Sequence, residues 1–228
     1  MTRSRGLDAL ITDGVFLAHE AQLAMADRLG DHDHWDVDLA AGEFRITGPQ
    51  PATFPVQLLG SAAPGPRSWL WGWGNPTQFA PQVLTAALTT RAFGEQHDVP
   101  ELVQAEVPFG DGGPEAGYEL GWSLSIAARL ASGTWFSYSG EVGGGTRVWM
   151  LLEGMLFDPP SVPRMLRVFG EALQTIEVND HRRAVGTWAQ LRGVPWDGRT
   201  MTLSDGSLSV DFDDQGRIRD LRGSSARA

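Results

Sequence analysis

The sequence predicts an α+β fold, in which an antiparallel sheet of hairpins has helices packed on it. Three features of the chain lead to this prediction. Short segments of alternating apolar and polar residues follow one another closely, and turns rich in glycine and proline separate them. Strands joined by such tight turns pair antiparallel. Longer segments with a 3.6-residue apolar period supply helices for one face of the sheet, which favours α+β over a wound parallel sheet.

The first part of the chain is predicted to begin with a helix and to continue into strands. Apolar residues recur with helical spacing over residues 7–29, and Gly30 ends this helix. In residues 34–47, apolar and polar residues alternate on both sides of an Ala-Ala-Gly turn, which is typical of a hairpin with one solvated face. Residues 54–63 form a third strand, and the segment SWLWGWGNP, residues 68–76, forms a fourth.

Two helices and a hairpin are predicted to follow these strands. Pro81 starts a helix that Gly94 ends, and an extended connection then leads to Pro114. A second helix runs from Pro114 to about Ala131. The segments TWFSYSG and TRVWMLLEG flank the glycine-rich EVGGG, and together they form a hairpin.

The C-terminal part is predicted to consist of two helices and a hairpin sheet. The first helix covers residues 162–178, and Asn179 or Asp180 caps the second, which ends near Leu191. Three short strands follow, and the Asp205-Gly206 turn between the first two is a strong hairpin signal.

A domain boundary is predicted near residue 158. The segment FDPPSVP contains three prolines, and the acidic charge of the preceding chain becomes nearly neutral beyond it. Residues 159–228 are too few to bury a stable core alone. We therefore expect a Trp-rich domain over residues 1–158 and an extension over residues 159–228 that docks on it.

The composition excludes several classes of chemistry. The 228 residues include no cysteine, so disulfides, thiolate catalysis and cysteine-ligated metals are excluded. All 18 basic residues are arginine, which removes Schiff-base lysines and the lysine of a phosphate-binding P-loop. A net charge of −10 repels the phosphate backbone, so nucleic acid is not an expected partner.

No hydrophobic segment is long enough to suggest a membrane protein. A span needs roughly 18 or more consecutive apolar residues, and the sequence has no such run. Near the start of the chain, Asp8, Asp13 and Glu20 interrupt the apolar stretch that a signal peptide would need. We therefore expect a soluble, cytoplasmic protein with no membrane interaction.

The most distinctive segment places three tryptophans at alternate positions. Residues two apart in a strand point to the same side, so Trp69, Trp71 and Trp73 should form one aromatic stripe. Burial under the neighbouring helices is the favoured interpretation, because an exposed stripe of indoles would promote aggregation. The alternatives are a platform that stacks sugars or bases and an interface with a partner. Gly72 and Gly74, on the other face, would let a ligand or a second chain approach closely.

Two residues of this segment are candidate ligand-binding residues, Trp73 and Asn75. Because Asn75 precedes Pro76, its backbone is extended or turn-forming. Its amide is therefore expected to close the turn into the next helix, and substrate binding is the alternative.

The segment DHDHWDVD is the best candidate for a metal site. His32, His34, Asp36 and Asp38 would share one face of a strand, and these side chains are metal ligands. The alternative is the solvated face of a hairpin, which we favour because spacing alone supplies no second shell. We therefore predict no bound metal and no cofactor, and keep His34 and Asp36 as candidate ligand-binding residues.

Other polar clusters give weaker signals. His97 with Glu95, Asp98 and Glu101 could act as an acid–base cluster, although the end of a helix favours a histidine by itself. The glycine-rich EVGGG lacks the lysine and the strand-to-helix setting of a phosphate loop. A set of loop carboxylates could serve as glycosidase acids, namely Glu106, Asp111 and Glu115.

The segment SWLWGWGNP resembles the signature W-L-W-x-W-x-N of an uncharacterised bacterial family, which is known only as a domain of unknown function. The flanking segments HWDVDLAAGEFRI, RAFGEQHDVPEL and WFSYSGEVGGGTRVWMLL are also similar. The resemblance covers residues 7–155 and implies no activity, because none is established for the family.

Taken as a whole, the sequence predicts a non-catalytic binding domain for a protein partner or a small ligand. We expect a monomer or a weak homodimer. The alternative is a hydrolase-type enzyme that uses His34 and Asp36, or His97. A hydrophobic cleft with converging polar side chains would favour the enzyme.

Overall fold

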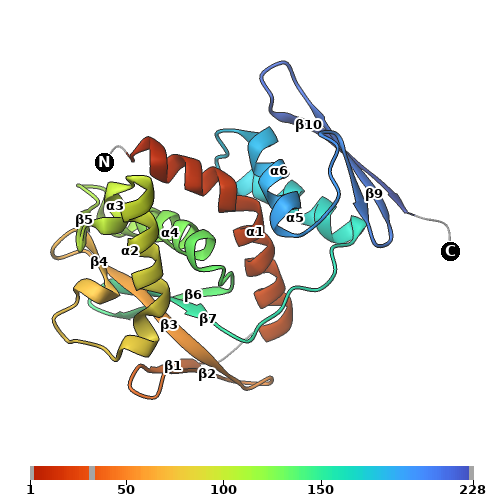
Figure 1. The fold of residues 1–228 in the computed structure, drawn as a ribbon. Helices are drawn as coiled ribbons and strands as arrows, with labels where there is room; N and C mark the ends of the chain where they lie inside the picture. The colour runs from red at the N-terminus through yellow and green to blue at the C-terminus, as the bar shows by residue number, and fades with distance from the viewer. Residues whose placement is uncertain (1–2, 31–33, 226–228) are drawn as a thin grey trace. The chain divides into compact units, whose positions relative to one another are not determined.

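The computed structural model describes residues 3–30 and 34–225, and their fold is α+β, which confirms the predicted class (Figure 1). The chain falls into two compact units. The first unit comprises Met1–Ile11 and Ala24–Met155, and the second comprises Thr12–Leu23 and Leu156–Ala228. The long helix α1 (Arg5–Leu29) therefore contributes its two ends to the first unit and its middle to the second.

The first unit contains an antiparallel sheet with helices on it. Its strands, within the described residues, are β1 (His34–Asp38), β2 (Glu43–Thr47), β3 (Ala52–Ala63), β4 (Ser68–Trp71), β5 (Glu106–Pro108), β6 (Ser137–Gly143) and β7 (Thr146–Leu152). Its further helices are η1 (Gly72–Gly74) and η2 (Pro81–Leu84), which are 3-10 helices, and α2 (Thr85–His97), α3 (Pro100–Val103) and α4 (Gly113–Ser132).

The long strand β3 organises this sheet. It pairs with β2 through its first residues, with β4 through its last residues, and with β7 along most of its length. Strands β1 and β5 extend the sheet beyond β2 and β4, and β6 pairs with β7. Helices α2 and α4 pack against each other and against β3, so they cover the same face (Figure 1).

Capping residues explain where α1 begins and ends. Ser4 Oγ accepts a hydrogen bond from the backbone N–H of Leu7 at 3.2 Å, so Ser4 is the N-cap. The helix therefore starts at Arg5, slightly before the predicted residue. Gly30 ends it, as predicted, with a positive φ of 57°.

Two buried tryptophans form the centre of the first unit's core. The side chains of Trp69 and Trp71 are fully buried in β4, and their rings meet edge-to-face at 5.2 Å. Trp149, from β7, packs against Trp69 with ring centroids 5.3 Å apart. The predicted burial is therefore confirmed for Trp69 and Trp71.

The prediction that the strand and its aromatic stripe continue through Trp73 was wrong, although the ring is mostly buried. Strand β4 ends at Trp71, and Trp73 lies in the 3-10 helix η1. The period-2 alternation of the strand therefore stops at Trp71. A Cβ at Gly72 would lie 2.9 Å from the side chain of Leu84, so the chain turns where a neighbouring side chain already fills the space.

The predicted end of the helix that starts at Pro81 was also wrong. Helix α2 continues through Gly94 to His97, and Asp98 caps it in the left-handed conformation. Glycine is required at position 94 inside this helix because a Cβ there would approach the Cβ of Leu102 to 2.5 Å. This glycine lets α2 pack closely against α3. Helix α3 and strand β5 both form in a segment that was predicted to be only extended.

The second unit has two further helices and a three-stranded antiparallel sheet. The helices are α5 (Val162–Thr175) and α6 (His181–Leu191), and the strands are β8 (Thr200–Leu203), β9 (Gly206–Phe212) and β10 (Ile218–Ser225). The strand order in the sheet is β10-β9-β8. Asp180 is the N-cap of α6, because its side chain accepts a hydrogen bond from the backbone N–H of Arg183.

Helix α1 completes the core of the second unit through its middle turns. The rings of Phe16 and Phe169 lie 4.8 Å apart, and Phe169 in turn meets Trp188 at 5.2 Å. Trp188 Nε1 donates a hydrogen bond of 2.8 Å to the buried carboxylate of Glu20. Arg192 Nε lies 3.3 Å from the same carboxylate.

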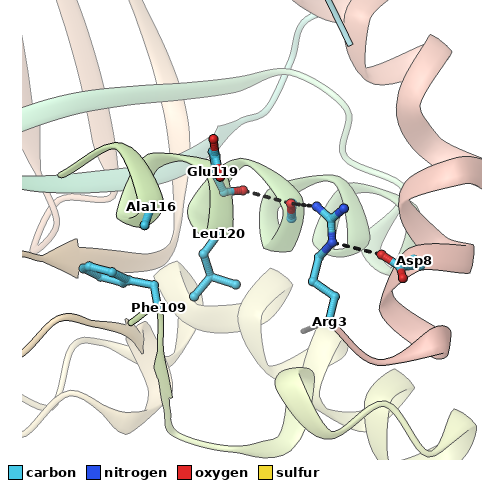
Figure 2. A pocket seen from close by; sticks show the side chains of 7 residues that line it. Arg3, Asp8, Phe109, Ala116, Glu119 and Leu120 are labelled. Carbon is cyan, nitrogen blue, oxygen red and sulfur yellow. Dashed lines mark hydrogen bonds and ion pairs between the residues drawn. The ribbon is translucent and has the colours of Figure 1, made fainter. Parts of the chain in front are cut away.

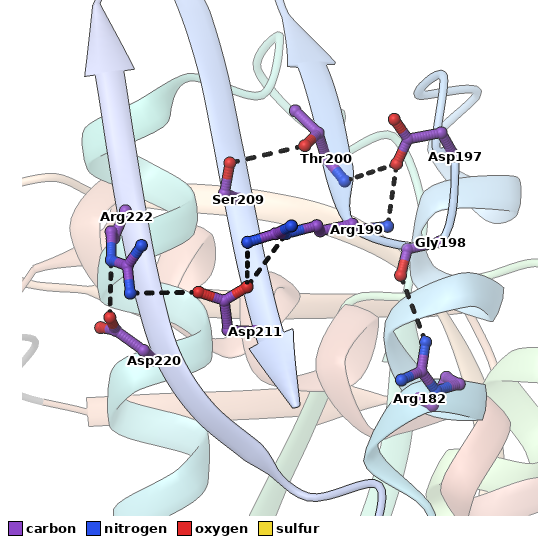
Figure 3. A network of polar contacts seen from close by, with 9 residues as sticks. All are labelled: Arg182, Asp197, Gly198, Arg199, Thr200, Ser209, Asp211, Asp220 and Arg222. Atoms are coloured by element: carbon purple, nitrogen blue, oxygen red, sulfur yellow. Dashed lines mark hydrogen bonds and ion pairs between the residues drawn. The ribbon is translucent and has the colours of Figure 1, made fainter. Parts of the chain in front are cut away.

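The sheet of the second unit carries a network of arginines and aspartates (Figure 3). Asp211 accepts a hydrogen bond of 3.0 Å from Arg199 and forms an ion pair of 3.1 Å with Arg222. Arg222 also forms an ion pair with Asp220. Each of these arginines faces at least one carboxylate, so the network has no strong excess of either charge. That the extension over residues 159–228 docks on residues 1–158 stays a prediction.

Candidate ligand-binding groove

The first unit has a groove beside the first turns of α4, which we call the α4 groove. Its volume is about 680 Å³. The residues that line it come from β3, β6 and β7, from the connections that follow β3, β5 and β6, and from the start of α4. They are Ala62, Pro64, Phe109, Pro114, Glu115, Gly117, Tyr118, Glu119, Glu141, Gly145, Arg147 and Trp149.

Aromatic rings and glycines form the apolar part of the groove. A Cβ at Gly117 would lie 3.1 Å from Cζ of Phe109, and one at Gly121, a turn later, would lie 2.5 Å from Cζ2 of Trp149. Glycine weakens a helix by about 1 kcal/mol relative to alanine. The two glycines are therefore explained by the close approach of these rings to α4.

One aromatic side chain of the groove is well exposed, and an exposed valine lies next to the groove. Tyr118 on α4 has 48% of its surface exposed, and Val142, next to the lining residue Glu141, has 52%. Large side chains this exposed are candidates for contact with a ligand or a partner, because an aromatic ring combines apolar area with few rotatable bonds.

Carboxylates dominate the rim of the groove. Glu115, Glu119 and Glu141 are exposed, and Arg147 is the basic residue among the lining residues. The Nη1 of Arg147 donates to the carbonyl oxygen and to Oγ of Ser139, at 3.2 and 3.3 Å. Its guanidinium also lies 5.5 Å from the ring centroid of Tyr118. The acidic excess favours a positively charged ligand.

A second hollow adjoins the α4 groove, and we call it the Arg3 hollow (Figure 2). Its volume is about 490 Å³, and it shares Phe109 and Glu119 with the groove. The Arg3 guanidinium lies in it, with Nε 2.9 Å from Asp8 and Nη1 donating to Ser123 Oγ at 3.2 Å. Ala116 and Leu120 complete its lining.

The candidate ligand-binding residues from the sequence lie in two separate places. His34 and Asp36 are exposed on β1, whereas Trp73 and Asn75 follow β4. Strand β1 pairs with β2, which meets the first residues of β3, while β4 meets the last ones. The sheet therefore does not bring the two pairs together, and neither pair lines the α4 groove or the Arg3 hollow.

The polar residues of β1 have structural partners. Asp36 lies 3.6 Å from Arg45 on β2, and Asp38 Oδ1 accepts from the backbone N–H groups of the hairpin turn. His32 lies outside the described residues. In the part of the chain that the structure describes, no three histidine or acidic side chains group closely enough to hold a metal ion.

Trp73 and Asn75 each have a role in the fold. The guanidinium of Arg91 lies 4.6 Å from the centroid of the Trp73 ring, so one face of the indole is covered. Asn75 Oδ1 accepts from the backbone N–H of Thr77 at 2.9 Å and closes the turn that the sequence suggested. A ligand role for these two residues stays a prediction.

The other candidate clusters also have local partners. Glu101 accepts from the backbone N–H and the hydroxyl of Ser4, at 2.6 and 2.7 Å, and so anchors the start of α1. The ring of His97 packs on Phe93 at 4.2 Å. Of the three loop carboxylates, Glu106 accepts from Ser68 and Asp111 pairs with Arg67, whereas Glu115 lines the α4 groove.

Sequence reasoning did not identify the α4 groove. Two signals in the sequence could have suggested it. Gly117 and Gly121 stand four residues apart inside a predicted helix, which indicates a close approach by another element. Tyr118, between them, is one of only 2 tyrosines in the chain.

Comparisons with known proteins place most of the chain in a family. The model described as "Family of unknown function (DUF6882)" matches residues 8–155, which confirms the resemblance to a domain of unknown function. It does not test the bacterial origin or the W-L-W-x-W-x-N signature. Searches of the curated proteins and of the solved structures each returned no match. No helix within the described residues is both long and apolar enough to span a membrane.

Proposed function

We propose that this chain, which belongs to the family of unknown function DUF6882, is a non-catalytic binding domain. Its α4 groove holds a ligand that has a positive charge and an apolar body. The observation that carries this proposal is the combination of aromatic walls and three rim carboxylates in one open groove of about 680 Å³.

Physical complementarity supports this class of ligand. The ring of Tyr118, 48% exposed, offers contact area to a planar or aliphatic body, whereas Phe109 and Trp149 line the groove with only 5% and 2% of their surface exposed. Glu115, Glu119 and Glu141 attract a cation, and their exposure makes the attraction depend on salt. The ligand is a small amine or a basic side chain of a protein partner.

The hydrolase alternative has no comparable support. His34 and Asp36 are exposed on β1, and Asp36 pairs with an arginine. His97 packs on a phenylalanine ring, while Glu101 is buried against Ser4. A general base needs a positioned partner and a reacting group within hydrogen-bond reach, and no described cluster offers that arrangement around these histidines.

Isothermal titration with two matched probes tests the proposal. Phenethylammonium combines a ring with a positive charge, and 3-phenylpropionate carries a negative charge on a similar body. We expect the full-length protein to bind the ammonium probe and not the carboxylate probe, with weaker binding at higher salt. Tyr118→Ala should weaken binding by about 2- to 10-fold, because it removes one aromatic contact.

Leu88→Ala is the matched control for the tyrosine variant. Leu88 is a similarly exposed apolar residue, 42% accessible, but it lies on α2 and does not line the groove. It should leave the affinity unchanged. Equal binding of the two probes, or equal loss in the two variants, would reject the α4 groove as the binding site.

A further inference from the structure

We infer that the α4 groove and the Arg3 hollow act as one surface that binds an extended, arginine-containing segment of a partner protein. This inference rests on the proposed function and names its ligand. One arginine of the segment lies in the α4 groove, and a second takes the place of Arg3. The two hollows share Phe109 and Glu119, so a ligand can pass from one to the other along α4.

Arg3 demonstrates that the second hollow accommodates a guanidinium. Its Nε approaches Asp8, and its Nη1 donates to the hydroxyl of Ser123, which itself donates to the carbonyl oxygen of Glu119 (Figure 2). The Arg3 side chain retains 42% of its exposure. An ion pair this exposed is weak, so an arginine from a partner can displace it.

The geometry of α4 sets the spacing of the two basic residues. Glu115 lines the α4 groove, and Ser123 lines the Arg3 hollow eight residues later in the same helix. At about 1.5 Å of rise per residue, the two positions are about 12 Å apart along the axis. An extended chain covers this length in about four residues and turns the first and last side chains to the same side.

The charges of the surface favour a basic segment over an acidic one. Glu119 stands between the two hollows, with Glu115 and Glu141 on one side and Asp8 on the other. Exposed Tyr118 also suits a protein partner, because exposed tyrosines often anchor interfaces. Arg147 remains tethered to Ser139 and leaves the carboxylates in excess.

Fluorescence anisotropy with labelled nine-residue peptides tests the inference on the full-length protein. The probe GSRLSGRSG carries two arginines four residues apart, and the controls replace one or both arginines by serine. We expect the two-arginine peptide to bind about 5-fold more tightly than either single-arginine peptide. This ratio corresponds to the largest free energy usually found for one exposed ion pair, about 1 kcal/mol. Glu141→Gln should weaken binding of the two-arginine peptide by about 2- to 5-fold.

Arg3→Ala provides a test that loss of folding cannot imitate. Removal of the internal guanidinium frees the second hollow, so the two-arginine peptide should bind about 2- to 5-fold more tightly. The control is Arg5→Ala, which removes the same charge from an exposed residue that does not line the hollow. It should give no such gain.

The outcomes separate this inference from the proposed function. If phenethylammonium binds but the second arginine adds nothing, or Arg3→Ala and Arg5→Ala behave alike, the inference is wrong and the proposed function stands. If neither the ammonium probe nor any peptide binds, the proposed function itself is wrong.

Discussion

At the scale of single residues, the first unit depends on indole rings that lie against glycines. A Cβ at Gly60 would meet Cζ2 of Trp69 at 2.6 Å, and one at Gly140 would collide with the ring of Trp35. Trp149 occupies the same kind of position over Gly121. Protein interiors are packed as closely as organic crystals, so each missing side chain provides the space that a ring fills.

Substitution of Gly121 by alanine tests this packing. The added methyl group would lie 2.5 Å from Cζ2 of Trp149, so the ring or the helix must shift. We expect the free energy of unfolding to fall by about 1–3 kcal/mol, the usual cost of overpacking a core. Urea denaturation measures the change.

The control is Gly170→Ala in the middle of α5, where an added Cβ meets nothing within 4 Å. Without a clash, alanine should stabilise the helix by about 0.5–1 kcal/mol. If Gly121→Ala is also stabilising, Trp149 is not packed against that position.

At the scale of elements, local signals predicted most of the helices and strands. Asp180 caps α6 as expected, and the Asp205-Gly206 turn joins β8 to β9. Tertiary contacts overrode local signals elsewhere. The sequence predicts that Gly94 ends a helix, but the residue lies inside α2, where α3 packs closely against it.

The candidate site was less predictable than the elements. The residues of the α4 groove come from β3, β6, β7, α4 and the connection after β5, and they meet only because those parts of the chain are adjacent in the fold. Glu141, unlike Tyr118 with its flanking glycines, carries no local pattern that indicates this proximity. Trp73 and Asn75, by contrast, belong to a distinctive motif, but their side chains have partners within the fold.

The free energy of unfolding should depend on pH through Glu20, a residue of α1 whose carboxylate accepts a hydrogen bond from Trp188 of α6. Burial raises the pKa of the Glu20 carboxyl above its ordinary value of 4.5, although Arg192 and the Trp188 N–H act in the opposite direction. The folded protein therefore binds this proton more tightly than the unfolded chain. The resulting contribution to stability is fully present below the unfolded pKa and is lost as pH rises through the folded pKa.

Glu20→Gln removes this proton-linked contribution and keeps an acceptor for Trp188. We expect the stability of the variant relative to the natural protein to rise with pH above about 4.5, measured by urea denaturation at several pH values. Burial lowers the pKa of the neighbouring His19, but that group is present in both proteins and cancels in the difference. A difference that is constant with pH would contradict the raised pKa of Glu20.

At the scale of the whole molecule, α1 belongs to both compact units. Its middle turns share a core with α5 and α6, where Phe16 meets Phe169 and Glu20 accepts from Trp188. A chain that ends at residue 159 would leave Phe16 and Glu20 without these partners. We therefore expect residues 1–159 to be less soluble, or to melt at a lower temperature, than the full chain.

Expression of the two fragments measures this dependence. A soluble monomer of residues 1–159 with an unchanged melting temperature, together with a folded fragment of residues 161–228, would mean that the two parts are independent. In that case the predicted docking of residues 159–228 would be wrong.

The central claim, that the α4 groove binds a cationic and apolar ligand, is tested most directly by the indole N–H signals of the nine tryptophans in a ¹⁵N-correlated NMR spectrum. Single Trp→Phe variants assign the signals, and phenethylammonium is then titrated into the full-length protein. We expect a saturable shift that is larger for Trp149, which lines the groove, than for Trp73 or Trp188, which do not. A shift centred on Trp73, or no saturable shift at any indole, would contradict the claim.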